Sequence, residues 1–281
     1  MNKSVLILAL IIASQATNVC AEVAHNGICG EGCTYTLEDG VLTVSGTGSV
    51  AKIDDGAFHN NLFSTATPIK KIVIEDGIKE IGTWAFSNQP ELESVSTPAS
   101  LSKIGDYSFS GCSKLSNVQF SEGLEDIRSG AFRNTKLQEV KLPQSLDKIG
   151  PDAFQDTELS SIDIPSQVTN IGQFAFESTN ISTVEIPSAV TFIGVHAFDT
   201  ENMKMVYCTQ TQIRNKICSS DSNKKFGDAG IGSYSKNNDE STAYYGSDGK
   251  LKGFKNKRIY TIEEAMAISK PTGNRFRIRY K

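Results

Sequence analysis

Phenylalanine recurs along the middle of the chain at an almost constant interval. It stands at six positions that are 22 or 23 residues apart, each preceded by Ala or Ser: Phe86, Phe109, Phe132, Phe154, Phe176 and Phe198. Other apolar positions keep the same spacing. Each unit opens with Leu or Ile, has a β-branched residue three positions later and in most copies another apolar residue two after that, as in Leu159, Ile162 and Ile164. Such self-similarity is typical of a repeat protein.

These units predict a stack of coils. One unit is too short to bury its own apolar face, so neighbouring units must share a continuous core. The segment around the β-branched residue alternates apolar and polar positions, which favours a short strand, and Pro ends it in four copies. Equivalent strands would lie about 4.8 Å apart, with the phenylalanines in one buried column. We predict a mainly β solenoid with short parallel strands, six repeats over residues 69–200 and a small α+β module at the C-terminal end.

A glycine follows the second apolar pair in five copies. These glycines are Gly82, Gly105, Gly150, Gly172 and Gly194. They predict a backbone turn that disfavours a Cβ atom. The third copy has Arg128 instead, which implies either a different turn or a tolerated exception.

The repeated unit L-x-x-V-x-I-P-x-x-V-x-x-I-G-x-x-A-F, as read from Leu159 to Phe176, resembles the BspA-type leucine-rich repeat of bacterial surface and secreted proteins. The resemblance covers residues 51–207, and residues 29–46 are similar to the segment that often precedes such repeats. It implies a bacterial surface or secreted protein, often an adhesin that binds proteins of host or neighbouring cells.

The segments before the repeats predict export and a cap. Residues 1–21 contain an apolar stretch and the small-residue site Val19-Cys20-Ala21, which is typical of a secretory signal peptide. A lipid on Cys20 is the alternative, disfavoured because no leucine or small residue stands in the expected place. Residues 22–68 predict two strands joined at Asp39-Gly40, covering the open end of the solenoid, and a degenerate first coil at Ala57-Phe58. We expect a secreted protein, or one on the extracellular face of the cell envelope, with no transmembrane segment.

The segments after the repeats predict a second cap, a linker and a basic module. Residues 201–218 are expected to form the cap, with a last strand around Tyr207 and a short helix over residues 209–218. Residues 219–241 read as a flexible linker, and residues 242–281 as a hairpin, a helix and a final strand. That strand carries its positive charges on one face: Arg275, Arg277, Arg279 and Lys281.

Cysteine spacing suggests two local disulfides. Removal of residues 1–21 leaves five cysteines in a compartment where disulfides persist. Cys29 would pair with Cys33 and Cys208 with Cys218, which leaves Cys112 as a buried free thiol.

Charge and motif patterns argue against catalysis and nucleic-acid binding. The chain has a net charge of −4, while the stretch from Ser247 to Lys281 is strongly basic. This tail could contact anionic envelope polymers, whereas an exported chain with an acidic body is a poor match for nucleic acid. Three histidines, among them His25 and His196, complete no metal-ligand set, and no nucleophile, phosphate loop or cofactor motif stands out. We expect no enzyme, cofactor or metal; a hydrolase with two acids that meet in space is the least favoured alternative.

Two rows of residues are candidates for binding a partner. The outward side of the predicted strands, which we call the strand face, is polar, mixed in charge and without aromatic rings, and this favours a protein ligand over sugar rings. Its candidate contacts are Lys71, Val73, Ser96, Gln119, Glu139, Lys141, Asp163 and Glu185. A second row, two residues before each phenylalanine, includes Trp84 and Tyr107. This aromatic pair either projects outward as a hot spot or folds back as packing, and packing is favoured. The hypotheses are protein recognition through the strand face, envelope docking through the basic module and, last, hydrolysis.

Overall fold

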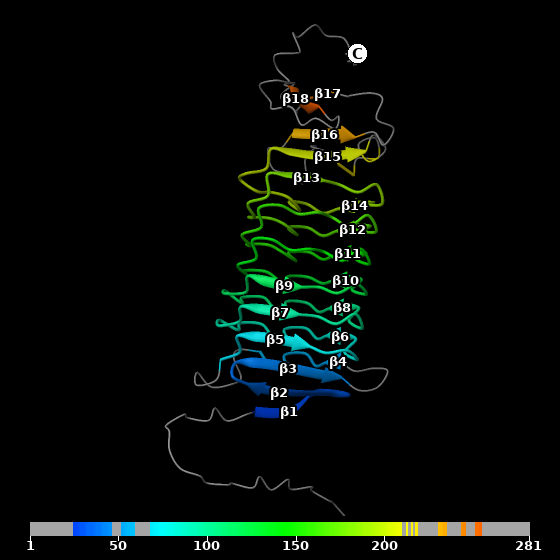
Figure 1. Cartoon of the computed structure of the whole chain (residues 1–281). Helices are drawn as coiled ribbons and strands as arrows, with labels where there is room; N and C mark the ends of the chain where they lie inside the picture. The colour runs from blue at the N-terminus through cyan, green and yellow to red at the C-terminus, as the bar shows by residue number, and fades with distance from the viewer. Residues whose placement is uncertain are drawn as a thin grey trace, which may run out of the picture.

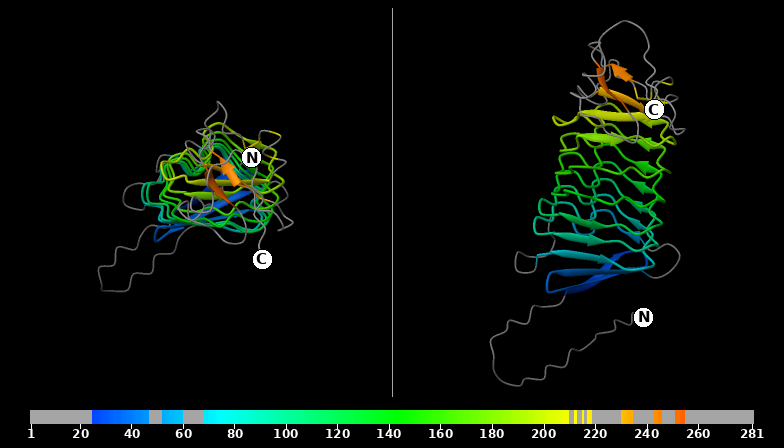
Figure 2. Two further views of the ribbon diagram at one scale, coloured as in Figure 1. Left: turned by 90° about the horizontal axis from the view of Figure 1, so that it is seen from above. Right: turned by 45° about the horizontal axis from the view of Figure 1, so that its top comes forward.

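The computed structural model describes residues 25–46, 52–59 and 68–209, positions 212, 215, 217 and 218, and the strands at 230–234, 243–245 and 251–254. After an antiparallel meander at residues 25–46, the described segments 52–59 and 68–209 form coils that stack in sequence order (Figure 1). Seen along the stack, the coils overlie one another (Figure 2). The predicted β solenoid is confirmed.

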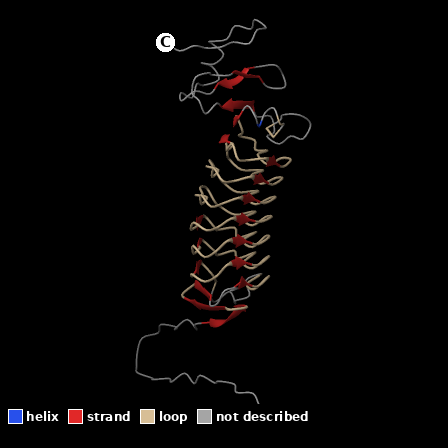
Figure 3. Ribbon diagram, turned by 90° about the vertical axis from the view of Figure 1, so that its right-hand side faces the viewer, coloured by secondary structure: helices blue, strands red, loops and turns tan. Residues whose placement is uncertain are grey.

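Two sheets form opposite walls of the stack, with turns between them (Figure 3). Sheet A begins as an antiparallel meander and continues with parallel strands: β1 (His25–Gly30), β2 (Cys33–Glu38), β3 (Val41–Gly46), β5 (Lys71–Ile74), β7 (Ser94–Ser96) and β9 (Asn117–Gln119). Sheet B is wholly parallel and contains β4 (Lys52–Ile53), β6 (Glu80–Ile81), β8 (Lys103–Ile104), β10 (Asp126–Ile127), β11 (Lys148–Ile149), β12 (Asn170–Ile171) and β14 (Phe192–Ile193).

Two smaller sheets follow. The first is parallel, in the order β13 (Thr183–Glu185), β15 (Met205–Thr209) and β16 (Gly230–Tyr234). The second is the antiparallel pair β17 (Ala243–Tyr245) and β18 (Leu251–Phe254), in the segment where the sequence predicts a hairpin.

The phenylalanine column forms the centre of the core. Neighbouring rings from Phe58 to Phe198 stack almost parallel, with centroids 5.1 to 5.5 Å apart and planes within 15° of each other. All seven rings are buried. Phe58 is the first ring of the column. It therefore occupies the phenylalanine position of a first coil, although the sequence around it differs from the repeat.

Buried threonines support the column from the same turns. The hydroxyl groups of Thr135, Thr157 and Thr179 each donate to the carbonyl oxygen of the phenylalanine three residues earlier, at 2.9 Å. Cys112 occupies the equivalent place in an earlier coil, and its Sγ lies 3.2 Å from the carbonyl oxygen of Phe86. These three hydroxyl groups and the Cys112 thiol therefore have partners, whereas the buried hydroxyl of Ser108, next to Phe109, has no hydrogen-bond partner in the described part of the chain.

The glycine column reflects the close approach of successive coils. A Cβ atom on Gly105 would lie 2.6 Å from the carbonyl oxygen of Ile81 in the preceding coil, and the other glycines of the column meet similar obstacles. Arg128 keeps the same turn, because its amide donates to Ile104 at 3.0 Å just as that of Gly150 donates to Ile127 at 2.7 Å. The arginine is thus a tolerated exception.

Two expectations about local structure were wrong. Coils four and five have no strand where Val140 and Ile162 predict one; only an isolated bridge joins Lys141 to Gln119. The proline that ends each segment does not explain the difference, because Pro98 and Pro187 stand at the same place after β7 and β13. Residues 219–241 are not wholly a linker, since β16 lies within them and pairs with β15 through its backbone.

Several expectations lie outside the described residues. These are the signal segment 1–21, most of the helix over residues 209–218, the rest of the linker, and the helix and basic strand of the last module, with Arg275, Arg277, Arg279 and Lys281.

Candidate binding surfaces

Strand register brings part of the strand face into one row. Val73 pairs with Ser96, Ser96 with Gln119, and Gln119 forms the bridge to Lys141. The row passes from half-buried side chains at Val73 and Ser96 to exposed ones from Gln119 onward. Asp163 and Glu185 are exposed at the equivalent positions of the next two coils, and Lys71 and Glu139 are exposed in the parallel row two residues earlier.

The strand face ends on a tyrosine that sequence reasoning left out of it. Glu185 pairs in register with Tyr207 across β13 and β15, so the row continues into β15. Burial raises the pKa of the Tyr207 hydroxyl, and the nearby carboxylate of Glu185 raises it further. The face is therefore not free of aromatic rings. Tyr207 stands 22 residues after Glu185, and this repeat interval was the available signal.

Charges on the strand face are largely unpaired. In the described part of the chain, Lys71, Glu139, Lys141 and Asp163 make no ion pair or side-chain hydrogen bond. Exposed ions of this kind are fully hydrated and remain available to a partner.

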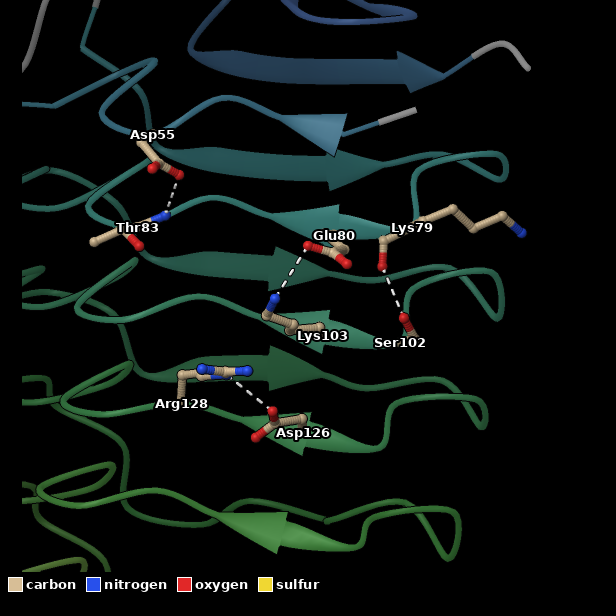
Figure 4. Close-up of polar contacts among 8 residues, drawn as sticks. All are labelled: Asp55, Lys79, Glu80, Thr83, Ser102, Lys103, Asp126 and Arg128. Carbon is tan, nitrogen blue, oxygen red and sulfur yellow. Dashed lines mark hydrogen bonds and ion pairs between the residues drawn. The ribbon is translucent and has the colours of Figure 1, made fainter. Parts of the chain in front are cut away.

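Sheet B presents the opposite case, because charged side chains on its outward side form ion pairs, between neighbouring coils for Lys103 and Glu80 and within one coil for Arg128 and Asp126 (Figure 4). Lys103 Nζ lies 3.2 Å from Glu80 Oε2, and Arg128 Nε lies 2.9 Å from Asp126 Oδ2. Register places Glu80 and Asp126 on either side of Lys103, so the charges alternate from coil to coil. Opposite charges on neighbouring strands stabilise their pairing.

The aromatic pair lies on the edge of the solenoid where the phenylalanine turns are stacked. Trp84 and Tyr107 have left-handed backbones, with φ of 59° and 53°, and their rings stack with centroids 4.5 Å apart. Trp84 keeps 42% of its surface exposed, while Tyr107 is half-buried and its ring lies against Gly130. The rings therefore pack against each other while Trp84 still borders solvent, and a role as a binding hot spot stays a prediction.

The same edge carries a cluster of two carboxylates and a histidine. Nδ1 of His196 lies 2.7 Å from Oδ2 of Asp199, and one ligand atom from each of Glu177, His196 and Asp199 lies within 4.8 Å of the others. Glu177 comes from the preceding coil, 22 residues before Asp199. From the sequence, His196 was expected to complete no metal-ligand set; the available signal was the 22-residue repeat interval that connects Glu177 with Asp199.

The cysteines divide into two bridges and one inert thiol. The sulfur atoms of Cys29 and Cys33 are 2.00 Å apart, and those of Cys208 and Cys218 are 1.99 Å apart. Cys112 is buried and free, and burial raises the pKa of its thiol to about 12. A thiol that stays protonated at neutral pH is a poor nucleophile, so Cys112 has a structural place in the column.

Among the described residues, no helix is long and apolar enough to cross a membrane.

Comparison with known proteins agrees with the repeat architecture. The profile of the BspA type leucine-rich repeat region matches six copies, over residues 42–157 and 126–224. A leucine rich cell surface protein from Faecalibacterium prausnitzii A2-165 has 21% identity and a TM-score of 0.51, covering 82% of this chain and 60% of its own. A leucine-rich repeat protein from Bacteroides ovatus ATCC 8483 has 19% identity and a TM-score of 0.45, covering 69% and 60%. The chain thus spans about 60% of the length of these two structures. No curated protein matches it. Because the family profile covers more than half of the sequence, the chain belongs to the BspA-type leucine-rich repeat family.

Proposed function

We propose that this chain is a non-catalytic scaffold, exported to the outside of a bacterial cell, that binds a protein ligand through its strand face in adhesion to host or neighbouring cells. One observation supports this most directly: Lys71, Lys141 and Asp163 make no ion pair in the described part of the chain. The charges of sheet B are paired, as in Glu80 with Lys103. Unpaired charges can meet opposite charges on a ligand without first breaking an internal contact.

The geometry of the face also suits a protein. Equivalent side chains of successive coils are separated by about 4.8 Å, which produces a long ordered surface of donors, acceptors and charges. A ligand with its own extended surface can contact many coils at once. Sugar rings usually require several aromatic platforms, and among the described side chains of the strand face Tyr207, which is half-buried, is the one aromatic ring.

The test is a charge exchange on the strand face. The purified full chain, immobilised, is exposed to surface proteins extracted from host and neighbouring bacterial cells, and the bound protein is identified. The double variant Lys141→Glu with Asp163→Lys should reduce its affinity at least tenfold, with an unchanged melting temperature. The matched control is Lys79→Glu with Glu125→Lys, which exchanges two exposed charges beside sheet B that make no ion pair in the described part of the chain; it keeps the net charge and should retain binding. Equal affinity of both variants would remove the strand face from the proposal.

Docking through the basic C-terminal module is the second candidate. Ten Lys or Arg side chains against three acids from Ser247 to Lys281 favour contact with anionic envelope polymers. Attachment of the full chain to whole cells can be compared with that of a chain ending at Ser241. Loss of attachment after truncation would support docking by the module, whereas retained attachment would leave the strand face as the contact.

A further inference from the structure

We propose that Glu177, His196 and Asp199 bind a divalent transition-metal ion, with Zn²⁺ preferred. The three side chains come from two neighbouring coils. Each is partly buried and offers one ligand atom to a common point, with all three atoms within 4.8 Å of one another. An imidazole nitrogen with carboxylate oxygens is a donor set that zinc accepts in proteins, and the imidazole disfavours Ca²⁺ and Mg²⁺, which prefer oxygen ligands.

The distances fit a small rearrangement on binding. Zinc lies about 2.0–2.2 Å from nitrogen and oxygen ligands, so tetrahedral ligand atoms are about 3.3 Å apart. His196 Nδ1 and Asp199 Oδ2 are closer, at 2.7 Å, and the three ligand atoms all lie within 4.8 Å of one another. Rotation of these side chains would bring the ligand atoms to the spacing that zinc requires, on a backbone fixed by hydrogen bonds such as that from the amide of Phe176 to the carbonyl oxygen of Ala197.

The local charge favours a cation. In the described part of the chain, no Lys or Arg forms an ion pair with Glu177 or Asp199. In earlier coils on the same edge, by contrast, Arg133 Nε lies 3.8 Å from Asp156 Oδ2. A cation at this cluster would meet two carboxylates whose ligand atoms lie within 4.8 Å of each other and of a histidine nitrogen. A bound divalent ion would balance both charges.

Neighbouring side chains hold two of the ligands in place. The ring of His196 stacks on that of Phe174, with centroids 5.3 Å apart and planes 7° from parallel. The amide nitrogen of Gln155 donates a hydrogen bond to Oε2 of Glu177. Such outer contacts orient metal ligands and reduce the ordering needed on binding. Three protein ligands leave one tetrahedral position open to water.

The experiment is calorimetric titration of the chelator-treated full chain with ZnCl₂, CaCl₂ and MgCl₂. We expect one saturable Zn²⁺ site per chain, no comparable Ca²⁺ or Mg²⁺ binding, and a melting temperature that rises with Zn²⁺ concentration. His196→Asn and Glu177→Gln should each weaken Zn²⁺ binding at least tenfold. Co²⁺ in place of Zn²⁺ should give visible absorption bands that His196→Asn abolishes.

Control variants separate this site from chance binding. His59→Asn removes a histidine outside the cluster and Asp126→Asn a carboxylate of sheet B, and both should bind Zn²⁺ as the parent does. Melting curves without metal establish that every variant is folded. The proposal is overturned if the parent shows no saturable site, or if His196→Asn retains both the Zn²⁺ affinity and the Co²⁺ bands.

Discussion

The phenyl ring of Phe154 lies parallel to that of Phe176 in the next coil, with centroids 5.4 Å apart and planes 4° from parallel. On its other side Phe154 stacks on Phe132 at 5.5 Å. The side chain is completely buried. Each inner ring of the column therefore stacks on the rings of both neighbouring coils, and these contacts hold the coils together.

Phe154→Ala should lower the free energy of unfolding by about 3–5 kcal/mol, because truncation leaves a cavity between two rings that backbone hydrogen bonds hold apart. Urea unfolding followed by circular dichroism measures the loss. Phe192→Ala is the matched control, since Phe192 is 52% exposed on sheet B and should cost about 1 kcal/mol or less. Similar losses for the two variants would contradict a structural role for the column.

Stability should depend on pH through Cys112. Its thiol pKa is raised by burial from 9.0 to about 12, so the folded chain keeps the proton that the unfolded chain releases above pH 9. The stabilisation from the neutral thiol is complete below pH 9 and is lost as pH rises from 9 towards 12. Urea midpoints at pH 8 and pH 11 should therefore differ more for the parent than for Cys112→Thr. Thr is the matched control because it occupies this place at Thr135, Thr157 and Thr179.

Gly172→Ala should destabilise the solenoid by about 1–3 kcal/mol through overpacking. Its added Cβ would stand 2.3 Å from the amide nitrogen of Pro151, which is backbone and cannot rotate away. Thermal unfolding measures the change. Arg128→Ala, at the one copy that already carries a Cβ, should change stability by about 1 kcal/mol or less, because it removes only an exposed ion pair. A neutral Gly172→Ala would mean that the coils can move apart at little cost.

Repetition explains which parts of the fold the sequence predicts. Phe154 and its equivalents recur every 22 or 23 residues, so the stacking of one pair predicts the stacking of the whole column. Sheet B was not predicted as strands, because pairs such as Lys148–Ile149 are too short to show alternation. β16 was interpreted as linker because residues 219–241 are rich in Ser, Asn, Asp, Lys and Gly and contain few apolar residues, yet its backbone pairs with β15.

The candidate sites were harder to predict because they combine residues from different coils. The strand face follows from alternation within one unit, so Gln119 and Lys141 could be assigned to it directly. Tyr207 belongs to the strand face because it stands one repeat interval after Glu185. Glu177 belongs to the histidine cluster because it stands one repeat interval before Asp199. Ion pairs such as that between Glu80 and Lys103 depend on side-chain rotamers and on the register between neighbouring coils. The repeat pattern in the sequence predicts neither of these.

Tyr107→Ala should expose a second face of Trp84, the only tryptophan in the chain. The two rings stack at 4.5 Å with planes 12° apart, so Tyr107 shields one side of the indole while 42% of the tryptophan stays accessible. Removing the phenol ring should increase quenching of Trp84 fluorescence by acrylamide and lower stability by about 0.5–1.5 kcal/mol, the contribution of one aromatic pair. Tyr207→Ala, in the distant strand β15, should leave the quenching unchanged. Unaltered quenching in Tyr107→Ala would mean that the two rings do not stack in solution. The aromatic pair would then not be an ordered surface available to a partner.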